Sequence, residues 1–270
     1  MAIYCNAAGE GFYWGSASIP DLSYWAVSLW LHHSAVPSSF GSLGGIQRTD
    51  GTNAHLILSD ATPTQLALYD TLGASSNIVA LTVGTWYHVY ALNSNGSGSG
   101  GCRAAGSGTY STATCTNFTV SAGTHYFGCG VQAYGAGWTL DSRIAHYKVW
   151  SGSTGLPTVA QLQQEGLSAR PILPVTWAWL PCWDASTYTS DRSGLGRNAT
   201  ANSGSPTTAD GPPVGWGAAP LFVPSISQIW QYGRPISDVA KGSWTASTGS
   251  DLYAMIDEEG VSDADYIRSP

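Results

Sequence analysis

Apolar and polar residues alternate along much of residues 11–150. The pattern is clearest in YWAVSLWLHH, where Trp25, Val27, Leu29 and Leu31 fall on one side of an extended chain. Further short segments of this kind follow, separated by Gly, Ser and Asn, at residues 53–60, 65–70, 77–93, 102–106, 114–120, 126–132 and 138–150. Strands that follow one another without intervening helices pair antiparallel, so the pattern predicts an all-β fold of two packed sheets, a sandwich or jelly roll.

A glycine-rich stretch, SNGSGSGG at residues 94–101, interrupts the alternating segments. It carries no apolar pattern and is predicted to be a flexible loop between strands. The formal G-x-G-x-x-G match from Gly96 to Gly101 has no βαβ unit around it, so it does not indicate dinucleotide binding.

One segment, residues 156–167, has helical character. Pro157 stands near its start, Val159 and Leu162 follow helical spacing, and Gly166 marks its end. A single short helix in an otherwise β-rich chain is consistent with a β-sandwich.

The chain after this helix returns to extended patterns. Residues 174–181 predict a strand with Val175, Trp177 and Trp179 on one face. Residues 203–224 are rich in Gly, Pro, Ser and Ala and predict an extended strap or linker. The expected organisation is therefore a domain over residues 1–222, which includes this strap, and a separate segment over 223–270.

Composition excludes several classes of protein. Only 10% of the 270 residues are charged, and the net charge of −7 argues against a nucleic-acid partner, because phosphate binding needs a basic patch. No run of about 18 apolar residues occurs, so no membrane span is expected. The first residues lack a basic region followed by an apolar one, and we expect no secretory signal.

The cysteines are odd in number and widely spaced. In a chain without a secretory signal they are predicted to be free and mostly buried thiols, with disulfides as the alternative. The five are Cys5, Cys102, Cys115, Cys129 and Cys182. Three N-x-S/T sequences, at Asn95, Asn117 and Asn198, are expected to occur by chance.

The C-terminal residues 251–270 differ from the rest of the chain. They contain six acidic residues and one base, Arg268, a net charge of −5 out of the total of −7. A purely solvating tail has no need of apolar residues, yet residues 223–270 contain Ile229, Trp230, Trp244, Leu252, Tyr253, Met255, Ile256, Tyr266 and Ile267. These are predicted to be the partner-binding residues of an assembly arm that binds extended, by strand addition. A disordered tail is the alternative.

Several motifs carry a resemblance to a known family. Residues 137–162, GWTLDSRIAHYKVWSGSTGLPTVAQL, resemble the closing signature of laminin-G-like, concanavalin A-like jelly rolls, in which a Gly and an acid precede a strand with an Arg and an aromatic residue. Residues 24–33 and 84–93 resemble two earlier strands of that family, and 179–204 resemble an ending seen in phage members. The resemblance covers about residues 11–215 and implies a two-sheet jelly roll with one short helix.

A second resemblance concerns residues 234–270. This segment resembles one that recurs in tailed-phage structural proteins. It implies that the chain is a component of a phage particle and that the arm docks on a neighbouring subunit.

Catalysis is not expected. Glycoside hydrolases that share this jelly roll carry a close E-x-D-x-E cluster on one strand, and a retaining mechanism needs two carboxylates about 5–5.5 Å apart. Before residue 258 this chain has only two glutamates, Glu10 and Glu165, and no predicted strand carries paired acids. His32 and His33 are adjacent on a strand and point to opposite faces, so they cannot both bind one metal ion.

Calcium is the one cofactor considered, because laminin-G-like domains bind it through loop carboxylates. The candidate ligands are Asp141, Asp184 and Asp191. The favoured interpretation is that these aspartates instead hold turns and strand ends by hydrogen bonds.

Exposed aromatic rings can stack on sugars, and this chain has twelve tryptophans. Trp25 is predicted to lie in the core. Trp14, Trp138 and Trp183 stand near turns and are the candidates for glycan binding.

These observations lead to two hypotheses. The first is a non-enzymatic phage virion protein, a capsid decoration protein or head fibre, made in the host cytoplasm and bound to the major capsid protein or another virion protein. It is expected to be a homo-oligomer, with a trimer considered. The second is a carbohydrate-binding adhesion module, and the phage tail is one location considered for it. Fold alone does not decide between them.

Overall fold

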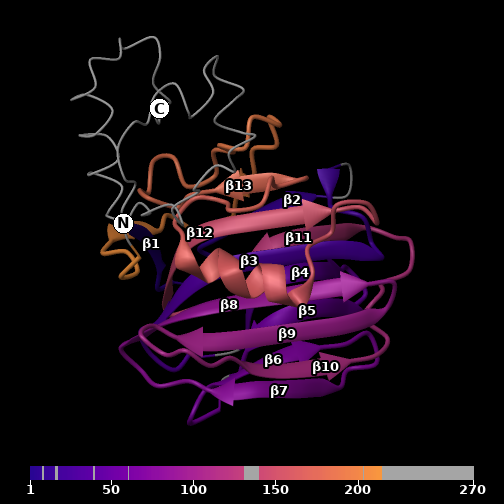
Figure 1. Ribbon diagram of the computed structural model, residues 1–270, viewed down its shortest axis with the longest axis horizontal. Helices are drawn as coiled ribbons and strands as arrows, with labels where there is room; N and C mark the ends of the chain where they lie inside the picture. Colours follow the sequence, from indigo (N-terminus) through magenta and orange to yellow (C-terminus); the bar gives the residue numbers. More distant parts are fainter. Residues whose placement is uncertain are drawn as a thin grey trace, which may run out of the picture. The chain divides into compact units, whose positions relative to one another are not determined.

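A computed structural model describes residues 1–214, apart from residues 8, 16, 17, 39, 60, 131–139 and 203. The regular secondary structure of the described chain is almost entirely antiparallel strands (Figure 1). The predicted fold class, a two-sheet jelly-roll sandwich with one short helix, is confirmed.

The first sheet has eight strands. Its order is β10 (Ser111–Cys115), β9 (Ser97–Ala104), β8 (Thr85–Ser94), β3 (Tyr24–His33), β12 (Ser142–Ser151), β1 (Ala2–Cys5) and β15 (Thr207–Ala209), and β13 (Ala178–Leu180) also pairs with β12. The second sheet has seven strands, in the order β14 (Thr200–Ala201), β2 (Phe12–Gly15), β11 (His125–Cys129), β4 (Gly41–Arg48), β5 (Asn53–Leu58), β6 (Gln65–Tyr69) and β7 (Ser75–Ala80).

The core lies between the two sheets. Trp25, Val27, Leu29 and Leu31 of β3 all belong to it, as the alternation predicts. Burying each such aliphatic side chain contributes about 1.5–3 kcal/mol. His33 is fully buried while its neighbour His32 is partly exposed, so the two histidines point to opposite faces as expected.

The glycine-rich stretch is a strand, and its prediction as a flexible loop is wrong. Asn95 and Gly96, with φ of 52° and 88°, form the two-residue turn between β8 and β9, and Ser94 pairs with Ser97. A Cβ atom on Gly101 would lie 2.4 Å from the ring of Tyr90. The glycines are therefore required where neighbouring rings pack directly against the backbone of β9.

Helix α1 (Val159–Gln164) covers part of the outer face of the first sheet (Figure 1). Thr158 caps its first turn, and a capping box with Gln161 completes the start. A short 3₁₀ helix (Glu165–Leu167) follows. Leu162 packs with the buried Tyr90 and Trp150 of the sheet, so the predicted helix at 156–167 is confirmed.

A buried ion pair fastens the end of this helical segment to the sheet. The Nζ atom of Lys148, on β12, lies 2.7 Å from Oε2 of Glu165, and both side chains are at most 1% exposed. Lys148 also donates to the carbonyl oxygens of Glu165, Ser168 and Arg170. The Glu165 carboxylate accepts from the backbone N–H groups of Ile172 and Leu173. The ammonium group of Lys148 and both carboxylate oxygens of Glu165 thus all have hydrogen-bond partners.

Two later predictions need correction. In the 174–181 segment the strand covers only β13, where Ala178 and Leu180 are buried in the core and Trp179 pairs with Lys148 on the outer face. The predicted strap at 203–224 contains β15, which pairs with β1 and forms one edge of the first sheet. The boundary between 1–222 and 223–270 lies outside the described residues and stays a prediction.

The cysteine side chains are free thiols, and all but the partly exposed Cys115 are buried. Burial raises the pKa of Cys129 and Cys182 well above the ordinary value, so these thiols stay protonated and inert. Among the described residues, no helix has the length and apolar composition needed to cross a membrane.

Candidate functional site

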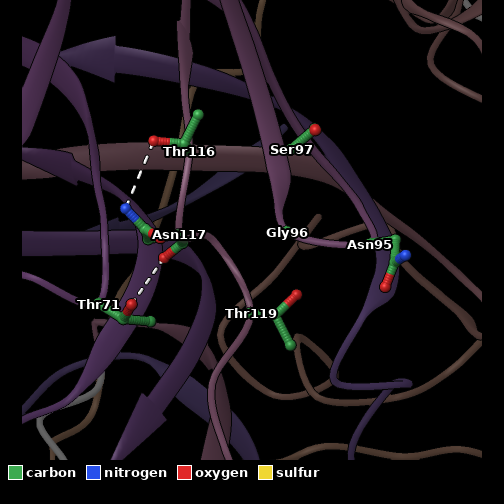
Figure 2. Close-up of a pocket in the computed structure, with 7 residues that line it drawn as sticks. All are labelled: Thr71, Asn95, Gly96, Ser97, Thr116, Asn117 and Thr119. Atoms are coloured by element: carbon green, nitrogen blue, oxygen red, sulfur yellow. Dashed lines mark hydrogen bonds between the residues drawn. The ribbon is translucent and has the colours of Figure 1, made fainter.

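A pocket of about 450 Å³ opens where three loops meet at the ends of strands. The loops are the β6–β7 turn, the β8–β9 hairpin turn and the segment that follows β10. In Figure 2, Thr71, Thr116 and Asn117 lie on one side and the hairpin residues Asn95, Gly96 and Ser97 on the other, with Thr119 between them. The lining residues are Thr71, Asn95, Gly96, Ser97, Thr116, Asn117 and Thr119.

Asn93, fully buried at the end of β8, ties two of these loops together. Its Nδ2 atom donates to the carbonyl oxygens of Phe118 at 2.8 Å and Leu22 at 3.0 Å. Its Oδ1 atom accepts from the backbone N–H of Gly96 at 3.0 Å. The hairpin turn is therefore held rigidly against the segment that carries Asn117 and Thr119.

Two asparagines in the left-handed backbone region shape the rim. Asn95 occupies the first position of the hairpin turn, where positive φ is required and Asn-Gly is preferred. Asn117 has φ of 58°, and its carbonyl oxygen accepts from both the backbone N–H and the hydroxyl of Thr71. This geometry leaves both asparagine side chains exposed at the pocket.

The lining is polar and carries no charge. Its side chains are hydroxyls and primary amides, which both donate and accept hydrogen bonds at neutral pH. Leu72, next to Thr71 in the chain, is 76% exposed. Such a pocket suits a neutral ligand rich in hydroxyl groups, and its lining offers no general acid, general base or nucleophile of shifted pKa.

A second polar surface lies on the outer face of the seven-stranded sheet. The strand register aligns Gly15, Tyr126, Gln47 and Asn53 in one row and Gly45, His55, Tyr69 and Ser75 in the next. Tyr13 and Tyr126 make an edge-to-face contact at 5.5 Å and are both partly exposed. Gln47, Asn53 and His55 are buried, whereas Tyr126 and Tyr69 are partly exposed and Ser75 is exposed.

The three tryptophans expected to bind glycans are placed differently from one another. Trp14 is 2% exposed and packs among Phe12, Phe127 and Tyr147, so the prediction that its ring is accessible is wrong. Alternation along β2 directs it into the core even though a turn is close by. Trp183 is partly exposed and contacts Trp179 edge-to-face. Trp138 lies outside the described residues.

The three candidate calcium ligands do not form one site. Asp184 accepts hydrogen bonds from the backbone and hydroxyl groups of Ser186 and Thr187, which lower its pKa to about 2. The described part of the chain holds no group of three His, Cys, Asp or Glu side chains in metal-binding geometry.

Asp191 has a similar role in the neighbouring loop. It accepts from the backbone N–H groups of Trp179, Ser193 and Arg197, and these bonds lower its pKa although burial opposes the shift. Asp141 has φ of 43°, and its carbonyl oxygen accepts from two backbone N–H groups at the end of β3. The turn-holding interpretation of these aspartates agrees with the structure.

The two glutamates of the described residues both have structural partners. Glu10 accepts from the backbone N–H groups of Asn6 and Ala7, and Glu165 is paired with Lys148. The two glutamates are therefore tied to separate parts of the fold.

A hydrogen-bonded chain resembling a catalytic relay is also present. Ser28 Oγ lies 2.8 Å from Nε2 of His88, whose Nδ1 lies 2.6 Å from the hydroxyl of Tyr110. Tyr110 donates to the carbonyl oxygen of Gln163, so His88 Nδ1 is the donor and Nε2 the acceptor. Ser28 and His88 are at most 1% exposed, and burial lowers the pKa of His88. No substrate can reach this serine.

The predicted arm lies outside the described residues. Its anchors Ile229, Trp230, Trp244, Leu252, Tyr253, Met255, Ile256, Tyr266 and Ile267 therefore stay predictions. The sequence does not predict the pocket residues, because the glycine-rich composition around Asn95 is typical of a flexible loop. The Asn-Gly pair between alternating segments is the signal that could have identified the hairpin.

No protein-family model matches the chain, and no curated protein matches it. Solved structures give a distant likeness. A heptameric SAP-like pentraxin from Limulus polyphemus is 15% identical, with 77% of this chain and 94% of the pentraxin covered and a TM-score of 0.48. A Bacteroides ovatus protein whose name proposes carbohydrate binding is 16% identical, with 79% of this chain and 62% of that chain covered and a TM-score of 0.49.

The full-length tailspike protein 2 of an Escherichia coli O157:H7 bacteriophage is 14% identical. The likeness covers 62% of this chain but only 25% of the tailspike, with a TM-score of 0.46. Likenesses at this level carry no conclusion about binding or activity.

Proposed function

We propose that this protein is a non-enzymatic, carbohydrate-binding β-sandwich of a tailed-phage particle. The observation that carries the proposal is the pocket lined by hydroxyl and amide groups (Figure 2). The hydroxyl groups of a sugar both donate and accept hydrogen bonds, and the primary amide of asparagine can bond to them as acceptor and as donor. The rigid hairpin behind Asn95 keeps these groups in place before the ligand arrives, which reduces the entropic cost of binding.

The expected affinity of one pocket is low. A neutral hydrogen bond contributes about 1 kcal/mol net, so a ligand that makes about four of them binds with a Kd of about 1 mM. Display of many copies raises the overall affinity by about 10²–10⁴ without new contacts. A weak sugar pocket is therefore most useful on a particle that carries many copies of it.

The finer proposal is a capsid decoration protein or head fibre. The acidic segment with apolar anchors at 223–270 and its resemblance to phage structural proteins support it. In this proposal the arm binds the major capsid protein or another virion protein, and the sandwich is displayed as a homo-oligomer. The alternative is an adhesion module on the phage tail.

The non-enzymatic part of the proposal rests on the engaged carboxylates. Within the described ranges, Glu10 holds its own loop and Glu165 neutralises Lys148. A pair of carboxylates facing a common cavity would be needed for glycoside hydrolysis.

A glycan array with the full chain tests the sugar proposal. Asn95→Gly and Asn117→Gly remove the two amides while keeping residues that tolerate positive φ. We expect the wild-type protein to bind a neutral glycan and the double variant to lose about tenfold or more, as expected for two lost hydrogen bonds. Asn6→Gly, the same change at an exposed loop position outside the pocket, should bind normally. Equal binding by the double variant would exclude this pocket.

Removal of residues 225–270 tests the virion proposal separately. The trimmed protein should fold but no longer join particles, as judged by gold-labelled antibody imaging of a lysate. Label over the heads supports a decoration protein, and label at the tail tip supports the adhesion module. If the trimmed protein still joined particles at full occupancy, the proposal that residues 225–270 attach the protein to the particle would be refuted.

A further inference from the structure

A row of large side chains crosses the outer face of the eight-stranded sheet, away from the pocket. The register places Thr207, Tyr4, Arg143, His32 and Trp86 side by side on five neighbouring strands, β15, β1, β12, β3 and β8. Thr207 is exposed and the other four are partly exposed. Directly opposed residues in antiparallel strands have Cβ atoms about 4.5–5.5 Å apart, so their side chains form one continuous surface.

Arg143 is the cation of this row and has no anionic partner among the residues that the structure describes. The two ion pairs of the described residues belong to Arg48 and Lys148. The Nε atom of Arg143 is buried and makes no hydrogen bond. Its guanidinium instead lies over the ring of Tyr4, whose centroid is 5.9 Å from Cζ. A planar cation with unused donors is preorganised for a carboxylate.

The remaining members of the row add aromatic surface rather than charge. His32 contacts Trp86 edge-to-face at 5.2 Å, and its Nδ1 atom lies 2.9 Å from the hydroxyl of Ser34. Burial and the nearby Arg143 lower the pKa of His32, so its ring is neutral at pH 7. The row therefore combines one fixed positive charge with the rings of Tyr4, His32 and Trp86.

We propose that this row binds an acidic saccharide, with the sugar carboxylate on Arg143 and the sugar ring on Trp86. Arginine recognises a carboxylate through two parallel N–H donors. The flat flanking rings favour a sugar ring over an extended acidic peptide, whose backbone would need partners for its own N–H and C=O groups. In a chain of net charge −7, one unpaired arginine among aromatic rings is a selective site rather than a general anion trap.

This site is independent of the pocket. Trp86 stands near the start of β8, and the hairpin turn with Asn95 follows its end at Ser94 (Figure 1). Trp86 and Ser94 are eight residue steps apart along the strand, which is about 27 Å at roughly 3.4 Å per step. Loss of one site should leave the other intact, so the two proposals fail separately.

Titration of the full chain with tetragalacturonate at low ionic strength tests the inference. We expect binding to weaken about tenfold or more in Arg143→Gln, because a charge-assisted pair is lost, and to weaken less in Arg143→Lys, which keeps the charge. Arg192→Gln, a matched change at an exposed arginine, and the Asn95→Gly/Asn117→Gly variant should bind like wild type. The methyl ester of tetragalacturonate, which keeps the rings but loses the charge, should not bind.

A measurement on the wild-type protein makes the test independent of variant folding. The indole N–H resonance of Trp86, assigned with Trp86→Phe, should shift on addition of tetragalacturonate. An unmoved resonance, equal binding by Arg143→Gln, or equal binding of the methyl ester would each overturn the proposal. Tetraglutamate bound as tightly as tetragalacturonate would also overturn it, since the occupant would then be an acidic peptide.

Discussion

Replacing Lys148 with Met should be among the most destabilising single changes in the sandwich. Lys148 and Glu165 form a salt bridge of 2.7 Å in a region where neither side chain is more than 1% exposed. The substitution keeps the apolar stem of the side chain but removes its charge and all its donors. It leaves the Glu165 carboxylate buried without a countercharge and three backbone carbonyls without their N–H donor.

The magnitude follows from the asymmetry of buried ion pairs. Breaking such a pair on one side costs about 3–5 kcal/mol, because the remaining charge stays buried. We therefore expect Lys148→Met to lower the free energy of unfolding by about 4 kcal/mol, and Tm by roughly 8–16 °C for a domain of this size. Adding Glu165→Gln removes the orphaned charge but keeps an acceptor for Ile172 and Leu173. The double variant should be more stable than the single one by about 1–3 kcal/mol.

Urea unfolding followed by tryptophan fluorescence measures both differences. The control is Arg48→Met, which breaks an ion pair whose side chains are 27% and 47% exposed and should cost at most about 1 kcal/mol. A loss below about 1 kcal/mol in Lys148→Met would refute the reasoning. So would a double variant that is no more stable than the single one, because the orphaned charge would then not be the cause.

Two further stability predictions follow from the same structure. Gly101→Ala should lower the free energy of unfolding by about 1–3 kcal/mol, because its Cβ atom would lie 2.4 Å from the Tyr90 ring. The control is Gly15→Ala, whose Cβ atom would meet no atom within 4 Å and which should cost well under that. Equal unfolding midpoints of the two variants in urea would contradict this prediction. Burial lowers the pKa of His55 and His146 to about 3. Between pH 6.5 and 3 the unfolded chain therefore binds protons that the folded chain does not. The free energy of unfolding should decrease as the pH is lowered through that window, by about 1.4 kcal/mol per pH unit for each histidine. Urea unfolding at pH 7 and pH 4.5 measures the fall, and equal stability at both would refute it.

The sequence was most informative where one local rule acted alone. Strand β3 could be predicted because its alternate residues face a single core, and Trp25 and Leu29 lie there. The helical segment could be predicted because Pro157 and Gly166 bracket an amphipathic turn. These features depend on neighbours in the chain, so no knowledge of the fold is needed to read them.

The pocket and the arginine row depend on contacts between distant residues. The glycines of β9 look like loop residues until the ring of Tyr90 and the core side chains are known to occupy the space of their missing Cβ atoms. Arg143 looks like a strand-end residue until the register places it beside Tyr4 and His32.

The two proposed binding sites lie at opposite ends of β8, and this arrangement decides whether they serve one ligand or two. Sites more than about 10 Å apart normally contribute additively. If each binds a separate sugar, combining Arg143→Gln with Asn95→Gly should give the sum of the two losses in binding free energy for a long acidic polysaccharide. If one chain occupies both, binding at the first site raises the effective concentration at the second. Either single change should then remove most of the avidity, so the two losses should sum to more than the loss of the combined variant. A titration of the four proteins with a polymer and with its tetramer separates these cases, because only the polymer can reach from one end of β8 to the other.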